Sequence, residues 1–308
     1  MTAYQKGGAL VRKYVAAVLA AGCLWGTMGF FTRSLAAIGI GSEGAILVRC
    51  AMAAVCFGVT ILLTDRKAFL VKPRDWWCFF GSGVCALLFF TWCYFHAITL
   101  MSLSAAAILL YTAPTIVMLL SAVFFKERIT PVKIAALALA FGGCCLVSGL
   151  GSGEGALTLT GVLFGLGSGV GYALYSIFAR FALDRGYSSS TINFYSCLLA
   201  ALGAAIIFGW QDTFAAFTAS WGNAGLCLLA GAVTCYLPYL FYTYGLSGLE
   251  TGRASILASV EPVVATLIGM LVYHETMSLL AALGVALVLS AVVLLNLPQK
   301  TKIEKNNP

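Results

Sequence analysis

Two charged side chains stand inside long apolar runs. Glu261 lies thirteen residues before His274, which places it about 20 Å from the expected outer end of its run if the run is helical. An ionised carboxylate at that depth in hydrocarbon must be solvated, paired or neutral. Glu261 is therefore a candidate for binding a solute or a proton. The alternative is that it bonds backbone donors freed by the adjacent Pro262.

Arg49 is the second such charge, about 9 Å inside its own run. A buried guanidinium could bind an anionic group of a solute, such as a carboxylate. The alternative is that the long side chain extends back to the membrane surface. Glu261 is a poor partner for Arg49, because their expected depths differ by about 10 Å.

Aromatic residues recur within the apolar runs. A group of them lining a cavity would suit a flat or apolar solute, although most aromatics in such chains pack together or lie in interfacial belts. The candidate solute-binding residues of this kind are Trp25, Trp92, Tyr111, Tyr172 and Tyr236, and we also note Tyr175 and Tyr239.

Two prolines, Pro114 and Pro262, stand in the middle of apolar runs. Proline removes a helical hydrogen bond and frees a carbonyl group. Each proline is a candidate hinge, or it exposes a polar carbonyl group to the transport pathway. The alternative is a kink that packing tolerates.

We expect no catalytic residue, no metal site and no cofactor. The two histidines, His96 and His274, have no cysteine or carboxylate beside them at metal-ligand spacing. The eleven cysteines lie mostly inside apolar runs and are expected to act as small apolar fillers. No phosphate-binding GxxxxGK[ST] motif is present.

Composition identifies the elements that must position these residues. The chain of 308 residues is 61% hydrophobic and 9% charged, with a mean hydropathy of +0.97, which indicates an all-α integral membrane protein. Runs of about 20 apolar residues can cross the bilayer. Ten such cores are expected at Val15–Phe31, Ala45–Leu63, Trp76–Ile98, Leu103–Phe125, Ile134–Leu150, Leu159–Phe178, Ile192–Trp210, Ala224–Tyr244, Ala254–Tyr273 and Leu279–Leu297.

The positions of Lys and Arg predict the orientation. With the N-terminus inside, every Lys and Arg except Arg33 and Arg49 lies in or beside a cytoplasmic segment. Both tails, 1–12 and 298–308, and the Val71–Asp75 loop are then cytoplasmic, and Gly151–Thr158 lies outside. The same rule explains the net charge of +7 without nucleic acid, and the expected location is the plasma (inner) membrane.

The two halves of the chain repeat. An offset of 148 residues aligns Pro114 with Pro262 and Glu127 with Glu275, and these glutamates are expected to anchor helix ends. Each half, 13–150 and 159–297, holds five expected spans. An odd number inverts the second half relative to the first. Inverted repeats are typical of secondary transporters, whose solute site lies where the repeats meet.

Three stretches of the sequence resemble the EamA family of the drug/metabolite transporter superfamily. They are Leu24-Trp25-Gly26, the segment from Tyr111-Thr-Ala-Pro114 to Phe125-Lys-Glu-Arg128, and the segment from Ser259-Val-Glu-Pro262 to Tyr273-His-Glu275. The resemblance covers roughly residues 13–297. Tyr172 departs from it, because a second Trp is frequent there. The resemblance implies a cavity walled by spans one, three, four, six, eight and nine, with spans five and ten outside it.

We therefore expect a secondary transporter that moves an amino acid or another small organic solute by alternating access, with export as the expected direction. Its partners are the solute and the lipid bilayer, and a homodimer is left open. The alternative class is a membrane-embedded protein that does not transport, such as an enzyme or a channel-like or interaction subunit.

Overall fold

The computed structural model describes residues 3–101, 103–148, 158–274 and 276–297. These residues hold nine helices that are long and apolar enough to cross a membrane, and Pro131–Val147 is a shorter apolar helix. The predicted architecture, an all-α membrane protein of ten spans in two inverted five-helix repeats, is confirmed.

The first repeat contains spans one to five. Its elements, in chain order, are α1 (Ala3–Gly26) and α2 (Met28–Ala37); α3 (Ser42–Thr64); the short 3₁₀ turns η1 (Arg66–Phe69) and η2 (Pro73–Asp75); α4 (Trp76–Phe80), the π-helical η3 (Gly81–Leu88) and α5 (Phe89–Leu100); α6 (Leu103–Leu110) and α7 (Ala113–Phe125); and α8 (Pro131–Val147).

The second repeat contains spans six to ten. Its elements are α9 (Leu159–Asp184); α10 (Ser189–Phe208); α11 (Gln211–Thr218); α12 (Trp221–Gly231), the π-helical η4 (Ala232–Tyr236) and α13 (Leu237–Leu246); α14 (Thr251–Ala258) and α15 (Glu261–Tyr273); and α16 (Leu279–Asn296). The short helix α11 was not predicted, because a run of eight residues gives little periodic signal.

Local structure follows the repeat offset of 148 residues. Thr130 and Ser278 cap α8 and α16 by accepting a hydrogen bond from the backbone N–H three residues ahead. Lys126 and His274 end α7 and α15 in the left-handed region, with φ of 56° and 54°. The matching caps at both helix ends show that the repeat is a repeat of backbone geometry as well as of residue types.

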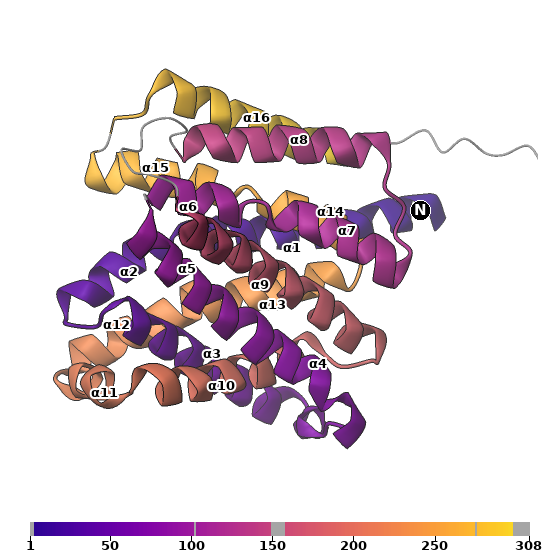
Figure 1. The fold of residues 1–308 in the computed structure, drawn as a ribbon. Coiled ribbons are helices and arrows are strands. Elements are labelled where there is room, and N and C mark those ends of the chain that lie inside the picture. Colours follow the sequence, from indigo (N-terminus) through magenta and orange to yellow (C-terminus); the bar gives the residue numbers. More distant parts are fainter. Residues whose placement is uncertain (1–2, 102, 149–157, 275, 298–308) are drawn as a thin grey trace, which may run out of the picture.

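Spans five and ten lie at the edge of the bundle. Helices α8 and α16 run side by side along it (Figure 1) and pack closely, since a side chain at Gly143 would come within 2.6 Å of the Gly284 carbonyl oxygen. The other spans interleave. Helix α1 of the first repeat packs on α13, α14 and α15, and α9 of the second packs on α5, α6 and α7.

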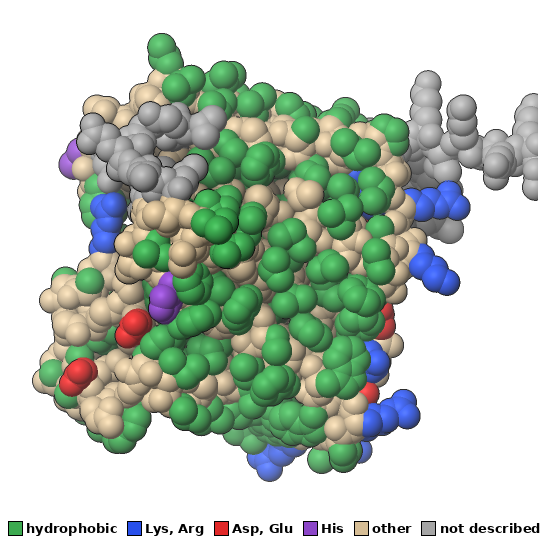
Figure 2. Space-filling model, viewed as in Figure 1, with side chains coloured by type: hydrophobic (Ala, Val, Ile, Leu, Met, Phe, Trp, Pro, Cys, Tyr) green, Lys and Arg blue, Asp and Glu red, His purple; other side chains and the backbone are tan. Residues whose placement is uncertain are grey.

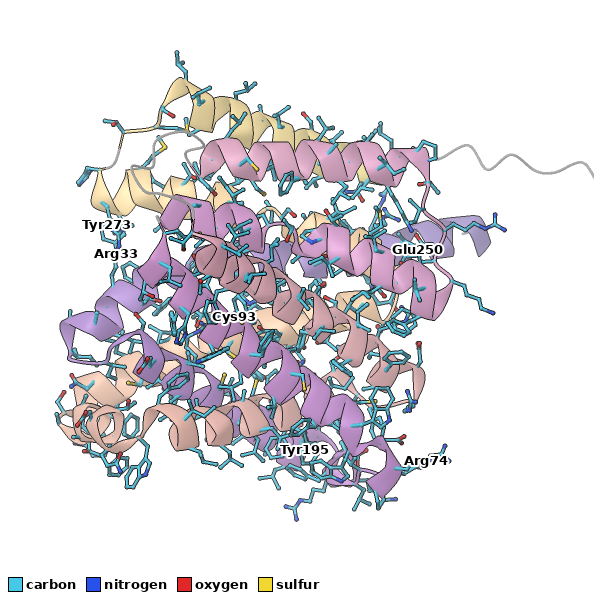
Figure 3. The ribbon with its side chains drawn as sticks, in the orientation of Figure 1. Arg33, Arg74, Cys93, Tyr195, Glu250 and Tyr273 are labelled. Carbon is cyan, nitrogen blue, oxygen red and sulfur yellow. The ribbon has the colours of Figure 1, made fainter. Side chains whose placement is uncertain are left out.

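The two ends of the bundle differ in charge. Apolar side chains spread over the middle of the face seen in Figure 2, and most of the visible Lys and Arg side chains lie toward its right-hand edge. Figure 3 places Arg74 and Glu250 on that side and Arg33 and Tyr273 on the other. We call them the basic end and the opposite end. The expected outer loop, 151–158, falls outside the described residues apart from Thr158.

Candidate functional site

Spans four and nine are both broken in the middle. Helix α6 gives way to α7 at Tyr111–Thr112, and α14 gives way to α15 at Ser259–Val260. Pro114 and Pro262 occupy the second position of the helix that follows each break, where the N–H that proline lacks has no helical partner to lose. Each proline begins a second half-helix, while Thr112 and Val260 before it keep a right-handed helical backbone, so each span continues beyond its break as a kinked helix. The role of the prolines as hinges stays a prediction.

A glycine of the other repeat lies against each break. A side chain at Gly22 would meet Val260 and the Ala258 carbonyl oxygen at 2.6 and 2.9 Å, respectively. A side chain at Gly169 would meet the Thr112 hydroxyl at 2.7 Å and, farther off, the Leu110 carbonyl oxygen at 3.5 Å. Spans one and six thus approach the breaks of spans nine and four so closely that a side chain has no room.

A small cavity of about 20 Å³ lies between the two breaks, at the interface of the repeats. Its walls come from spans four, six and nine and include Tyr111, Pro114, Tyr172, Ser255, Ser259 and Glu261. Three sequence-predicted residues, Tyr111, Tyr172 and Glu261, and the candidate hinge Pro114 therefore meet here. We call this space the break cavity.

Glu261 is the acidic group of the break cavity. Its side chain is half-buried in the first turn of α15. Within the described residues, no hydrogen bond or ion pair reaches its carboxylate. The bonding to freed backbone donors that the sequence analysis held as the alternative is not among the hydrogen bonds of this structure. The carboxylate lines the break cavity, and no described residue is bonded to it.

An aromatic cluster adjoins the break cavity and shares Tyr172 with it. The Trp25 ring lies 5.2 Å from Tyr239, 5.3 Å from Tyr242 and 6.2 Å from Tyr172, between centroids. These rings, together with Phe90 and Tyr175, line a second small cavity whose walls come from spans one, three, six and eight. Together the two cavities are walled by spans one, three, four, six, eight and nine, as expected, and their linings include no residue of spans five or ten.

A buried polar network holds the cluster in place. The Tyr175 hydroxyl donates to the Asn193 side-chain oxygen, and the Asn193 amide donates to the Tyr239 carbonyl oxygen at 3.1 Å. The Ser176 and Tyr242 hydroxyls lie 2.8 Å apart. These hydrogen bonds between α9, α10 and α13 hold the Tyr175 and Tyr242 rings of the cluster.

Arg49 turns toward the middle of span eight. Its Nε donates to the Thr234 hydroxyl at 2.8 Å, and Nη2 donates to the Thr234 carbonyl oxygen at 3.1 Å. Thr234 lies in η4, a π-helical segment whose backbone bonding is irregular. The guanidinium is half-buried and engaged by protein, so it does not extend to the end of its span.

Two predicted aromatic residues, like Arg49, are absent from the linings of both cavities. Trp92 packs on Phe164 and His96, at 5.3 and 4.7 Å between ring centroids. Tyr236 packs on Phe57 at 4.6 Å, and its hydroxyl lies 2.8 Å from that of Thr60. Aromatic type alone does not distinguish a cavity wall from such packing.

The sequence analysis missed Ser255, Ser259 and Tyr242. Ser255 lies in α14 and Ser259 directly follows its end, and a spacing of four residues places them on one side of the span. Tyr242 was visible as the repeat partner of Tyr94. These signals were present in the sequence, but they were weak beside the larger aromatic and charged residues.

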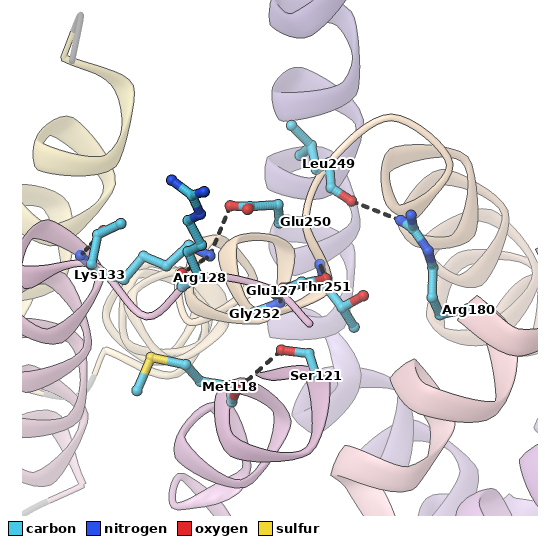
Figure 4. Close-up of polar contacts among 11 residues, drawn as sticks. Met118, Ser121, Glu127, Arg128, Lys133, Arg180, Leu249, Glu250, Thr251 and Gly252 are labelled. Atoms are coloured by element: carbon cyan, nitrogen blue, oxygen red, sulfur yellow. Dashed lines mark hydrogen bonds and ion pairs between the residues drawn. The ribbon is translucent and has the colours of Figure 1, made fainter. Parts of the chain in front are cut away.

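The two repeats are joined at the basic end (Figure 4). The Glu127 carboxylate, beyond the end of α7, accepts hydrogen bonds from the Thr251 and Gly252 N–H groups at 2.6 and 3.1 Å. It thereby caps α14 of the other repeat. Lys133 forms an ion pair with Glu250 at 2.7 Å. The predicted role of Glu127 as an anchor of helix ends agrees with these contacts, and Glu275 lies outside the described residues.

A second set of contacts ties the loops of the basic end. The Arg185 Nε and the Tyr187 hydroxyl donate to the two oxygens of buried Asp75, at 3.1 and 2.8 Å. Burial raises the pKa of Tyr187, which keeps its hydroxyl protonated as a donor. Within the described residues, no group of three or more His, Cys, Asp or Glu side chains is arranged to hold a metal ion.

Known proteins resemble this chain over most of its length. A solved crystal structure shares the fold, with a TM-score of 0.77 at 18% sequence identity, covering 91% of this chain and 95% of its own. An uncharacterized transporter of Archaeoglobus fulgidus is 32% identical over 204 residues, covering 65% of this chain and 70% of its own.

Two bacterial relatives cover more of the chain. The uncharacterized transporter YxxF of Bacillus subtilis is 24% identical, covering 94% of this chain and 90% of its own. The threonine/homoserine exporter RhtA of Escherichia coli is 26% identical, covering 86% of each chain. The profile of the EamA-like transporter family matches residues 12–149 and again 159–297. This chain is therefore a transporter of the EamA-like transporter family.

Proposed function

We propose that the protein is a secondary transporter that moves a small organic solute, of the size of an amino acid, by alternating access. The observation that carries the proposal is Glu261, a carboxylate that no described residue pairs with and that lines a cavity between two helix breaks at the interface of inverted repeats. Broken helices at such an interface are where transporters of this architecture bind their solutes. Tyr111, Tyr172 and Trp25 are the proposed aromatic contacts.

Alternating access needs one end of the pathway to close while the other opens. The Glu127 cap and the Lys133–Glu250 ion pair join the repeats at the basic end, and we infer that they close it here. Breaking these contacts would let α7 and α14 separate. Pro114 and Pro262 begin the half-helices that would move, which supports their proposed role as hinges.

We propose that the basic end faces the cytoplasm and that the protein lies in the plasma (inner) membrane, with both tails cytoplasmic. The repeats would then extend over 13–150 and 159–297. Export is the proposed direction, supported by the likeness to the exporter RhtA at 26% identity. An assembly of two copies is compatible with this proposal.

The test is transport by the purified protein in liposomes. Preloaded unlabelled solute should drive counterflow of the same labelled solute, in a panel that includes amino acids, amines, sugars and nucleosides. We expect at least one solute to show saturable counterflow. Leakage that never saturates would indicate a channel, and chemical conversion of a solute would indicate an enzyme; either result would overturn the proposal.

A further inference from the structure

We propose that the break cavity binds an organic ammonium group, with Glu261 as its counter-charge. The inference names the substrate class of the proposed transport site and rests on that function. It predicts a solute that carries a positively charged amine on an apolar or aromatic body, and it excludes solutes whose charge at this position is negative.

The first argument is charge. Within the described residues, the Glu261 carboxylate has no hydrogen bond or ion pair, although it lies deep in a span. Arg49 interacts with it electrostatically but directs its donors to Thr234 and Met28. A carboxylate in a low-dielectric interior attracts a cation strongly and repels an anion. The missing positive charge is therefore expected to arrive with the solute.

The second argument is an unsatisfied hydroxyl in the same cavity. Ser255 is 2% exposed, lines the break cavity with Glu261, and its Oγ lacks a hydrogen bond of normal geometry. The Tyr242 hydroxyl, which is bonded to Ser176, is also close enough to interact with Ser255, and a serine oxygen still has a lone pair for a further donor. An ammonium group has up to three N–H donors. A carboxylate and a free hydroxyl can accept two of them.

The third argument is the shape and chemistry of the walls. Tyr111 and Tyr172 flank the cavity, and aromatic faces attract cations within about 6 Å. Tyr172 also belongs to the aromatic cluster around Trp25. An ammonium held at Glu261 would therefore have its apolar body directed toward further aromatic rings. A sugar or a dianion would match neither the charge nor these walls.

The experiment is equilibrium dialysis of radiolabelled phenethylamine against the purified full-length protein in nanodiscs. Phenylethanol and phenylacetate serve as neutral and anionic competitors of the same size. We expect saturable binding of phenethylamine, with both competitors at least about tenfold weaker. Glu261→Gln should weaken binding about tenfold or more, and Ser255→Ala about threefold. The control Asp65→Asn removes an exposed carboxylate at a turn and should leave binding unchanged.

Several results would overturn the ammonium site. One is that the wild-type protein does not bind phenethylamine, and another is that phenylacetate competes as well as unlabelled phenethylamine. The third is that a monodisperse Glu261→Gln protein binds phenethylamine with unchanged affinity. If Glu261→Gln does not fold, the competitor series and Ser255→Ala still decide. Liposome counterflow separates the two proposals. Counterflow confined to neutral or anionic solutes overturns the ammonium site alone, whereas no counterflow of any solute overturns the transport function itself.

Discussion

At the scale of single residues, Arg49 shows how a costly buried charge can be satisfied by backbone. Its two hydrogen bonds to Thr234 connect span two to the irregular η4 segment of span eight. A cation inside a span is usually taken as a solute ligand. Here its geometry assigns it first to holding an element of the other repeat.

Arg49→Ala should therefore destabilise the protein by about 1–3 kcal/mol, because the buried Thr234 carbonyl and hydroxyl lose their donor. The measurement is thermal unfolding in detergent, combined with Thr234→Val in a double-mutant cycle. The two changes should be less than additive. Arg74→Ala, an exposed arginine whose side chain is 87% accessible, is the control. Strict additivity would contradict the assignment.

Sequence could predict the chemistry of individual residues better than their directions. The depth of Glu261 and its place before a proline could be predicted from the sequence. The same holds for the candidacy of Trp25, Tyr111 and Tyr172 as cavity residues. Trp92 and Tyr236 were equally plausible aromatics, yet they pack elsewhere. The direction of a side chain around a helix whose whole surface is apolar depends on neighbours that only the folded bundle supplies.

At the scale of elements, a glycine of the opposite repeat lies against each helix break. Gly22 lies against the break in span nine and Gly169 against the break in span four. These contacts place spans one and six at the walls of the two cavities. The spacing between elements, and not only the residues in the cavities, is therefore part of the site.

Gly22→Ala and Gly169→Ala should each lower the thermal stability and the counterflow rate. An added methyl group would meet atoms at 2.6 and 2.7 Å, and overpacking of this kind costs about 1–3 kcal/mol. The control is Gly142→Ala, also within a helix, where a side chain meets nothing within 4 Å. It should be neutral or stabilising, because alanine favours helix more than glycine does. Equal effects at all three positions would contradict the close-approach account.

Most elements were predictable because long apolar runs, scarce charges and paired prolines mark them. The ten predicted cores lie on the observed helices within a few residues at most ends. The prolines predicted a local disturbance in spans four and nine, but the π-helical segments η3 and η4 were not predicted, since hydropathy does not register a local change in backbone bonding. Such irregular segments are typical of sites where backbone meets a cavity.

At the scale of the whole molecule, the features of one half of the chain have counterparts in the other half. The caps, breaks and glycine contacts of one half recur in the other at nearly constant offsets. Two similar halves of opposite orientation allow two similar states, open to opposite sides. In the proposed cycle, the contacts at the basic end must break each time the solute passes that end.

A disulfide across the basic end tests that central claim most directly. A Cβ at Gly252 would lie 3.4 Å from the Ser121 hydroxyl oxygen, so cysteine side chains at the two positions would be in contact, as a disulfide requires. Ser121→Cys with Gly252→Cys, in a background free of the eleven native cysteines, would tether α7 to α14 and leave Glu127 intact. We predict that oxidation abolishes counterflow in liposomes, that a reductant restores it, and that neither single variant responds. Full-rate counterflow with the disulfide completely formed would contradict alternating access between the two repeats.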